Sequence, residues 1–228
     1  MPKKKIKNKL FEWGKAFLFT FLFLFMISII TLMFMVHLSY DLPTLDELKN
    51  FNPEQISKVI SADGQVLHKL QAIKKREVVK IGEVPQDLID ALLVMEDKEF
   101  YDHSGFSIKS TIRAIIVDLI TLSYKQGAST LTQQLARSMY DKITWEDRSI
   151  IRKMKELITA FNIEQTYTKS EILELYLNSV FLGHGRYGVQ SASQLYFDKN
   201  ISELNLDESA MLVGMLPAPN LYSPFRNI

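Results

Sequence analysis

Residues 86–105 read QDLIDALLVMEDKEFYDHSG and join an apolar helical pattern to a dense run of ionisable side chains. Leu88 and Leu92 lie one helical turn apart, which predicts an amphipathic helix that ends near Glu96. A carboxylate at the end of a buried helix loses solvent and becomes usable as a general acid or base, although most acidic residues simply face water. His103 is more typical of a structural hydrogen-bonding residue than of a ligand. The stretch therefore predicts a helical region and makes Glu96 a candidate catalytic residue.

Helical patterns continue on the C-terminal side of this stretch. An apolar face recurs along Ile108–Ile120 at helical spacing. Thr168 with Glu171 forms a capping box that starts one helix, and Asn205 with Glu208 starts another. The fold class is therefore predicted to be mainly α.

The N-terminal side of the stretch contains a short β element. Asp63-Gly64 separates two apolar runs, which is a strong indication of a β-hairpin. A further strand-like stretch covers Arg76–Ile81, and short helical pieces bounded by prolines precede the hairpin. We therefore expect a stalk with a small β element at residues 37–84 and a helical domain at residues 85–228.

The stretch AFLFTFLFLFMISIITLMFMV, residues 16–36, has neither charge nor proline. A helix needs about 20 apolar residues to cross a bilayer core, and this run is too long for a signal-peptide core. No small-x-small cleavage site follows it, so an uncleaved transmembrane anchor is predicted. A lysine-rich tail, residues 1–15, precedes it, and acidic residues follow it. Because basic flanks stay in the cytoplasm, we expect a single-pass protein with its N-terminus inside and its domain outside.

The composition narrows the classes of function. The net charge is only +1 and the lysine cluster adjoins an apolar span, which favours a topological role over nucleic-acid binding. The chain contains no cysteine, which excludes disulfides and thiolate metal sites. This composition suits an extracytoplasmic bacterial domain that folds without covalent cross-links.

Two further clusters could bind an anion. Residues 127–134, GASTLTQQ, crowd hydroxyls and amides into a loop before a helix, where they could hold phosphate or sugar oxygens or simply cap the helix. Arg148, Arg152 and Glu156 share one helical face, and Arg137 lies upstream. Cations that converge with an acid on a cleft would suit a pyrophosphate, with or without a divalent ion. The commoner alternative is a solvated charged face.

Taken in order, these stretches resemble the motifs of the peptidoglycan glycosyltransferases of family 51, found in monofunctional transglycosylases and in the N-terminal half of class A penicillin-binding proteins. The matching stretches are EDKEFYDHSG, GASTLTQQ, RKMKE at 152–156, KSEILELYLN at 169–178, and GRYG at 185–188 with YFDK at 196–199. The resemblance covers about residues 40–226. One departure is Asp198, which stands where the family usually has a glycine with its wider range of backbone angles.

The resemblance implies a lysozyme-like, mainly α-helical glycosyltransferase domain that polymerises lipid II into β-1,4-linked glycan strands and releases undecaprenyl pyrophosphate. Glu96 would be the general base of a single inverting displacement. Glu156 matches the family's second essential glutamate, which holds a divalent cation, Mg²⁺ or Mn²⁺, or orients the basic residues. The other site residues that the resemblance implies are Ser129, Thr130, Gln133 and Gln134 in the donor cleft and Arg137, Arg148, Arg152 and Lys153 around the leaving group.

The resemblance also implies partners and a location. We expect lipid II, the nascent glycan strand, the bilayer and other cell-wall synthesis proteins as partners, at the cytoplasmic membrane of a bacterium. The apolar segment 106–122 corresponds to a region near the lipid in this family, or else is an ordinary core helix. Neither a Ser-x-x-Lys motif nor a Lys-Thr-Gly triplet occurs, so serine transpeptidase chemistry is not expected on this chain. The short C-terminus predicts a truncated piece of a longer protein.

Two alternatives stay open at this point. A lysozyme-like hydrolase that cuts glycan strands would share the fold and the glutamate, but its sugar leaving group has little use for basic residues around Glu156. A non-catalytic, single-span scaffold of the wall-synthesis machinery would need neither Glu96 nor Glu156, and both are present.

Overall fold

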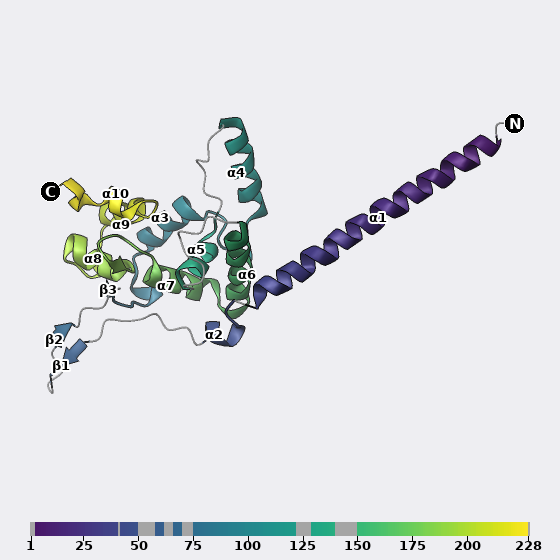
Figure 1. Cartoon of the computed structure of the whole chain (residues 1–228). Helices are drawn as coiled ribbons and strands as arrows, with labels where there is room; N and C mark the ends of the chain where they lie inside the picture. Colours follow the sequence, from purple (N-terminus) through teal and green to yellow (C-terminus); the bar gives the residue numbers. More distant parts are fainter. Residues whose placement is uncertain are drawn as a thin grey trace. The chain divides into compact units, whose positions relative to one another are not determined.

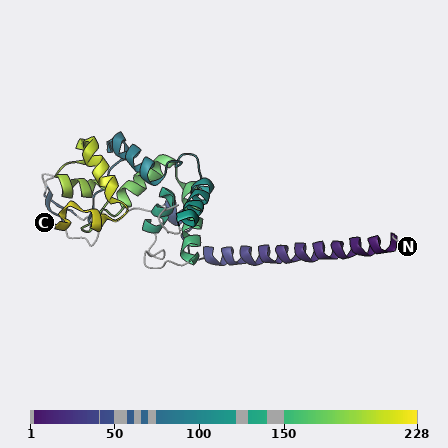
Figure 2. The same ribbon diagram turned by 90° about the horizontal axis from the view of Figure 1, so that it is seen from above.

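The computed structural model describes residues 3–40, 42–49, 58–61, 66–69, 75–121, 129–139 and 150–227. The chain divides into two compact units, Met1–Leu42 and Pro43–Ile228. Helix α1 (Lys3–Ser39) makes up the first unit and is one continuous helix, drawn in purple and blue in Figure 1 and Figure 2. Its stretch Trp13–Leu38 is long and apolar enough to cross a membrane, and the large apolar side chains along most of it are exposed.

The second unit is mainly helical, as the sequence predicts. Helix α5 packs against both α6 and α7, and α3 packs against α9 (Figure 1). The α-helices are α2 (Leu45–Lys49), α3 (Gln86–Glu96), α4 (Ile108–Thr121), α5 (Leu131–Met139), α6 (Ile150–Thr166), α7 (Lys169–Ser179), α8 (Val189–Phe197), α9 (Leu206–Met215) and α10 (Pro219–Tyr222). Short 3-10 helices are η1 (Ile81–Glu83), η2 (Ile201–Glu203) and η3 (Pro224–Asn227).

Capping boxes begin two of these helices at the predicted residues. The Thr168 side chain accepts a hydrogen bond from the Glu171 N–H, and the Glu171 carboxylate accepts one from the Thr168 N–H. Asn205 and Glu208 make the same reciprocal pair before α9. Each box satisfies N–H groups that have no partner inside the helix, which is why α7 and α9 start where they do.

The β structure is small and partly differs from the prediction. Strands β1 (Lys58–Ile60) and β2 (Val66–Lys69) pair antiparallel, which confirms the hairpin, although its Asp63-Gly64 turn lies outside the described residues. The predicted strand at Arg76–Ile81 is wrong for most of its length, because β3 covers only Lys75–Arg76 and pairs in parallel with β4 (Arg186–Tyr187).

Side chains, not a neighbouring strand, take the backbone groups that follow β3. The Asn178 amide accepts from the Val79 N–H at 2.9 Å and donates to the Val79 carbonyl at 2.8 Å. Glu174 accepts from the Ile81 N–H, at 2.9 Å. The extended segment that follows β3 is therefore held against α7 by side-chain hydrogen bonds and does not pair with another strand.

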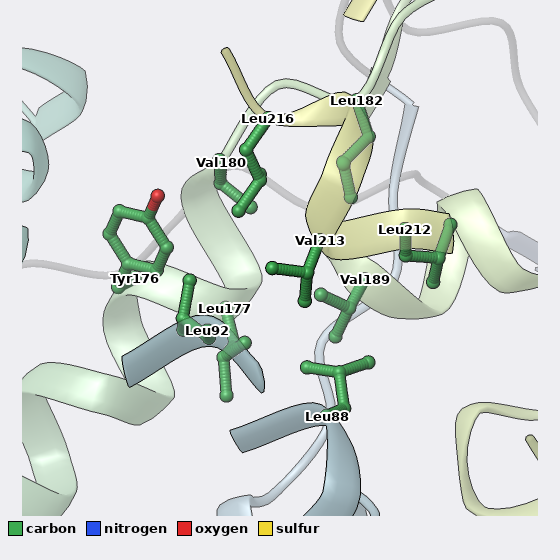
Figure 3. A pocket seen from close by; sticks show the side chains of 10 residues that line it. All are labelled: Leu88, Leu92, Tyr176, Leu177, Val180, Leu182, Val189, Leu212, Val213 and Leu216. Carbon is green, nitrogen blue, oxygen red and sulfur yellow. The ribbon is translucent and has the colours of Figure 1, made fainter. Parts of the chain in front are cut away.

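The hydrophobic core includes residues of α5 and α6, and one part of it lies where α3, α7, α8 and α9 meet. Figure 3 shows Leu88 and Leu92 of α3 facing Leu177 of α7 and Val213 of α9. All four of these side chains are buried. The helical spacing in the opening stretch thus correctly predicted the buried face of α3, and burial of that face sets the position of Glu96 at the end of the helix.

Helix α4 presents apolar side chains outward. Ile108, Ile112 and Ile116 follow one another at helical-turn spacing, and all three are exposed. The ordinary core-helix interpretation is wrong for these residues, which leave an apolar surface on the domain.

The departure at Asp198 is accommodated by the backbone. Asp198 ends α8 in the left-handed conformation, with φ 54° and ψ 37°. Its Oδ1 accepts a hydrogen bond from Gln194 Nε2 at 2.6 Å. The turn that suits glycine is therefore kept, at a cost of about 1 kcal/mol for a residue that carries a Cβ.

Candidate active site

Helix α5 is central to the candidate site because two of its adjacent faces carry polar side chains. Gln133 and Arg137, one turn apart, bond side chains of α6. Gln134 lies on the neighbouring face and bonds Glu96 at the end of α3. The candidate base and the cationic cluster thus contact successive residues of one short helix.

Glu96 is half-buried and is held by an amide. Its Oε2 accepts a hydrogen bond from Gln134 Nε2 at 2.7 Å. Gln134 Oε1 in turn accepts from the Tyr176 hydroxyl at 3.1 Å. The structure thus brings the predicted residues Glu96 and Gln134 together. The structure also places Tyr176 in this group of residues. In the sequence, Tyr176 is distinguished only by its hydroxyl in a largely apolar helical stretch.

Glu156 has a different environment. It is 0% exposed, and cations occupy both of its oxygens. Arg137 Nε of α5 lies 2.8 Å from Oε1, which Arg152 Nη1 of α6 also contacts, and Lys153 Nζ lies 3.2 Å from Oε2. A buried carboxylate is tolerated only with such partners, and it holds them in one place. The interpretation of these residues as a solvated charged face is wrong for this cluster, while Arg148 lies outside the described residues.

Lys153 connects this cluster to the start of α5. Its ammonium group donates to Ser129 Oγ at 2.8 Å and to Gln133 Oε1 at 2.7 Å. Desolvation lowers the pKa of Lys153 below its ordinary value, and the carboxylate of Glu156 opposes this effect. Because guanidinium groups stay protonated, Lys153 is the member of the cluster whose charge responds to pH.

A buried acid–imidazole pair positions the N-terminus of α5. His103 Nε2 lies 3.0 Å from the Asp97 carboxylate, which also accepts from the Leu131 N–H at 2.9 Å. His103 Nδ1 accepts from the Gly105 N–H at 3.1 Å. The prediction that His103 is a structural hydrogen-bonding residue is confirmed.

Thr130 and Gln133 support the loop before α4 instead of lining a cleft. Both are buried, and both donate to the Gly105 carbonyl, at 2.8 and 3.1 Å. Thr130 Oγ1 also caps α5 by accepting from the Gln133 N–H. The predicted substrate contacts of these two residues therefore lack support, whereas Ser129 and Gln134 are only half-buried. With the Leu131 and Gln133 N–H groups already bonded, anion binding at this helix end is not supported either.

A cavity of about 320 Å³ lies beside Gln134. It combines amide and hydroxyl groups with aromatic rings, a lining that suits a polar ligand with apolar faces. Its walls include Gln134, Ser138, Tyr176, Ser179, Phe181 and Tyr187.

The surroundings of Glu156 do not fit the predicted divalent cation. Mg²⁺ and Mn²⁺ prefer several oxygen ligands, whereas Glu156 is enclosed by ammonium and guanidinium groups. Within the residues that the structure describes, no three His, Asp or Glu side chains come together as a metal site. The cation stays a prediction, and no step of the reaction proposed below passes through it.

Comparison with known proteins identifies the domain. The family model described as Transglycosylase matches residues 63–228, which include all the motifs described above. The chain belongs to the transglycosylase family. The predicted resemblance and the mainly helical fold class are therefore confirmed.

Relatives of this transglycosylase chain are longer proteins. It is 42% identical over 186 residues to penicillin-binding protein 1A of Neisseria flavescens, covering 82% of this chain and 23% of that one. It is 40% identical over 194 residues to penicillin-binding protein 1A of Aquifex aeolicus, covering 85% and 26%. The chain thus spans about a quarter of the length of these relatives. A solved penicillin-binding protein 1A from Haemophilus influenzae matches 77% of this chain and 17% of its own at 27% identity, with a TM-score of 0.36, too low to support an argument about the fold.

Proposed function

We propose that this transglycosylase domain polymerises lipid II into β-1,4-linked peptidoglycan strands and releases undecaprenyl pyrophosphate. The proposal is carried by the placement of two unlike carboxylates beside adjacent faces of α5. Glu96 is half-buried and bonded to an amide, whereas Glu156 is fully buried among cations. Glu96 is open to proton exchange, and the Glu156 cluster offers fixed positive charge. An inverting displacement of a pyrophosphate needs these two functions.

Glu96 acts as the general base in this proposal. It takes the proton from the 4-hydroxyl of the acceptor sugar while that oxygen attacks the anomeric carbon of the donor chain. The new C–O bond forms as the bond between the anomeric carbon and the pyrophosphate oxygen breaks, and the electron pair leaves with undecaprenyl pyrophosphate. Attack from the face opposite the leaving group converts the α-linked donor into a β-1,4 bond without a covalent intermediate.

The cationic cluster stabilises the leaving group. Arg137, Arg152 and Lys153 converge on the Glu156 carboxylate, and these cations are proposed to bind the pyrophosphate. Because Glu156 fixes these groups before substrate arrives, little reorganisation is needed as negative charge develops. Arg148 is proposed to join them, and Ser129 and Gln134 to line the donor side.

The membrane has a role in the same proposal. The polyprenyl tail of the substrate stays in the bilayer, so an anchored enzyme shares a thin layer with it and gains effective concentration. Helix α1 would provide the anchor, with its N-terminus in the cytoplasm and the domain outside the cytoplasmic membrane of a bacterium. The outward isoleucines of α4 would contact lipid. The nascent glycan strand and other wall-synthesis proteins are the remaining proposed partners.

Replacement of the base tests this function directly. Glu96→Gln keeps the shape and the contact site for Gln134 but removes the proton acceptor, so polymerisation of labelled lipid II should fall by about 10²–10⁴-fold. Product strands are sized on a gel, with and without a divalent cation, and the melting temperature is measured in parallel. Asp90→Asn is the matched control, because this exposed carboxylate of α3 bonds Gln86.

Four outcomes discriminate between the candidate functions. Strands that lengthen with the wild type and fail to lengthen with Glu96→Gln support the proposal. Wild-type turnover by Glu96→Gln would refute the assignment of the base. Shorter fragments from preformed wall, without products from lipid II, would identify a hydrolase, and inactivity of the wild type in both assays would favour a scaffold.

A further inference from the structure

A line of hydrogen bonds leads from a buried tyrosine to the candidate base. We propose that Tyr176 is a positioning residue for this base: its hydroxyl orients the Gln134 amide so that the amide N–H, and not the carbonyl, faces Glu96. The inference rests on the proposed function, because it concerns how the base of that reaction is held.

The geometry gives each atom of the line one partner. The Tyr176 hydroxyl donates to Gln134 Oε1 at 3.1 Å, and Gln134 Nε2 donates to Glu96 Oε2 at 2.7 Å. These residues come from α7, α5 and α3, so the line crosses the domain between three packed helices. The shorter bond is the one to the carboxylate, as expected where the acceptor is charged.

The amide needs such a guide because its two ends are nearly equal in shape and opposite in polarity. With N–H toward Glu96, the amide stabilises the carboxylate that accepts the proton. With the carbonyl toward Glu96, two acceptor oxygens would face each other and the carboxylate would be destabilised. A donor on the far side of Gln134 therefore selects the orientation that keeps the base ready.

Tyr176 is suited to be that donor. Burial raises the pKa of its hydroxyl, and the negative charge of Glu96 raises it further, so the O–H is retained throughout the working range of the enzyme. Figure 3 shows its ring at the margin of the apolar core, with the hydroxyl pointing away from Leu92 and Leu177. The ring is thus held by packing while the hydroxyl is directed to Gln134.

Two other charged groups near the line have partners of their own. Arg137 of α5 pairs with Glu156, although its positive charge also acts on Tyr176 and opposes the rise in the pKa of the hydroxyl. Asp97, the neighbour of Glu96 in sequence, bonds His103 and the backbone of α5. The face that α9 turns to α3 carries the apolar residues Leu212 and Val213. A change at the Tyr176 hydroxyl should therefore reach Glu96 mainly through Gln134.

Tyr176→Phe removes the hydroxyl and leaves the ring in the core. We expect kcat for lipid II to fall about five- to tenfold with KM within about twofold, because the change weakens a bond to the base while the ring of residue 176 and the Gln134 amide stay in the cavity wall. Tyr167→Phe is the matched control: it also removes a partly buried tyrosine O–H, one that donates to the Leu48 carbonyl, and should leave both kcat and KM in place.

A double-mutant cycle separates positioning from simple packing. Gln134→Met keeps the side-chain length but has neither amide N–H nor carbonyl, and it should lower kcat at least as far as Tyr176→Phe. If the hydroxyl acts through the amide, Tyr176→Phe adds less than about twofold in the Gln134→Met background. Full additivity of the two changes, or an unchanged kcat in Tyr176→Phe, would overturn the inference. Glu96→Gln tests the base independently. Wild-type turnover by that variant would reject the proposed function, whereas a negative result from the double-mutant cycle alone would reject only the positioning role of Tyr176.

Discussion

The two glutamates of the candidate site differ in environment in the way that their proposed functions require. Glu96 ends a helix, keeps part of its surface in solvent and bonds a neutral amide. Glu156 lies inside α6, has no exposed surface and has cations on both oxygens. A glutamate side chain is thus partly open to solvent at Glu96, whereas at Glu156 it is enclosed and holds charged groups.

This difference shows that chemistry is assigned by environment and not by residue type. A carboxylate with solvent access and a neutral donor can change its protonation during a reaction. One that is desolvated among cations cannot, because removing its charge would leave those cations unpaired. Substitutions at and around the two carboxylates test how strictly these environments are separated.

The largest effect on stability is expected at the buried carboxylate. Glu156→Gln should lower the free energy of unfolding by about 3 kcal/mol, because Arg137, Arg152 and Lys153 then lose the buried carboxylate that they share. Thermal unfolding of this variant beside Glu96→Gln measures the contrast. Glu96→Gln should stay within about 0.5 kcal/mol of the wild type. Equal losses in the two variants would mean that both carboxylates are structural.

A smaller effect, on the pH dependence of polymerisation, is expected from Lys153. Because desolvation lowers the pKa of Lys153, its charge is lost at a lower pH than that of an ordinary lysine, and polymerisation should decline correspondingly early on the alkaline side. Lys153→Arg keeps the charge there, so the alkaline limb should move to higher pH while the rate near neutrality stays within about threefold. An alkaline limb that stays in place in Lys153→Arg would contradict the assignment of this limb to Lys153.

The smallest effect, on the free energy of unfolding, is expected at Asp198, which ends α8. Asp198→Gly relieves the left-handed conformation at φ 54° and gives up the bond to Gln194, with a net gain of about 0.5 kcal/mol in the free energy of unfolding. Denaturant unfolding measures the gain. The pH profile should be unchanged, and a kinetic change would show that the base and the cations also depend on this turn.

Local patterns in the sequence predicted much of this arrangement. The buried face of α3, the hairpin, the capping boxes of α7 and α9 and the apolar helix α1 each depend on residues close together in the chain. The structure differs where distant residues compete for the same groups. Asn178 and Glu174 take backbone groups that would otherwise extend β3, and Gly105 takes the side chains of Thr130 and Gln133. No pattern within a few residues could have revealed these long-range bonds.

Most of the secondary elements, the family and the choice of the two candidate glutamates therefore follow from the sequence alone, because periodicity, capping and motif order depend on neighbouring residues. Tertiary packing was needed to show which glutamate is open and which is enclosed, that Tyr176 reaches Glu96 through Gln134, and that cations surround Glu156. Burial and hydrogen bonding depend on which helices meet around α5, and those helix contacts exist only in the folded domain.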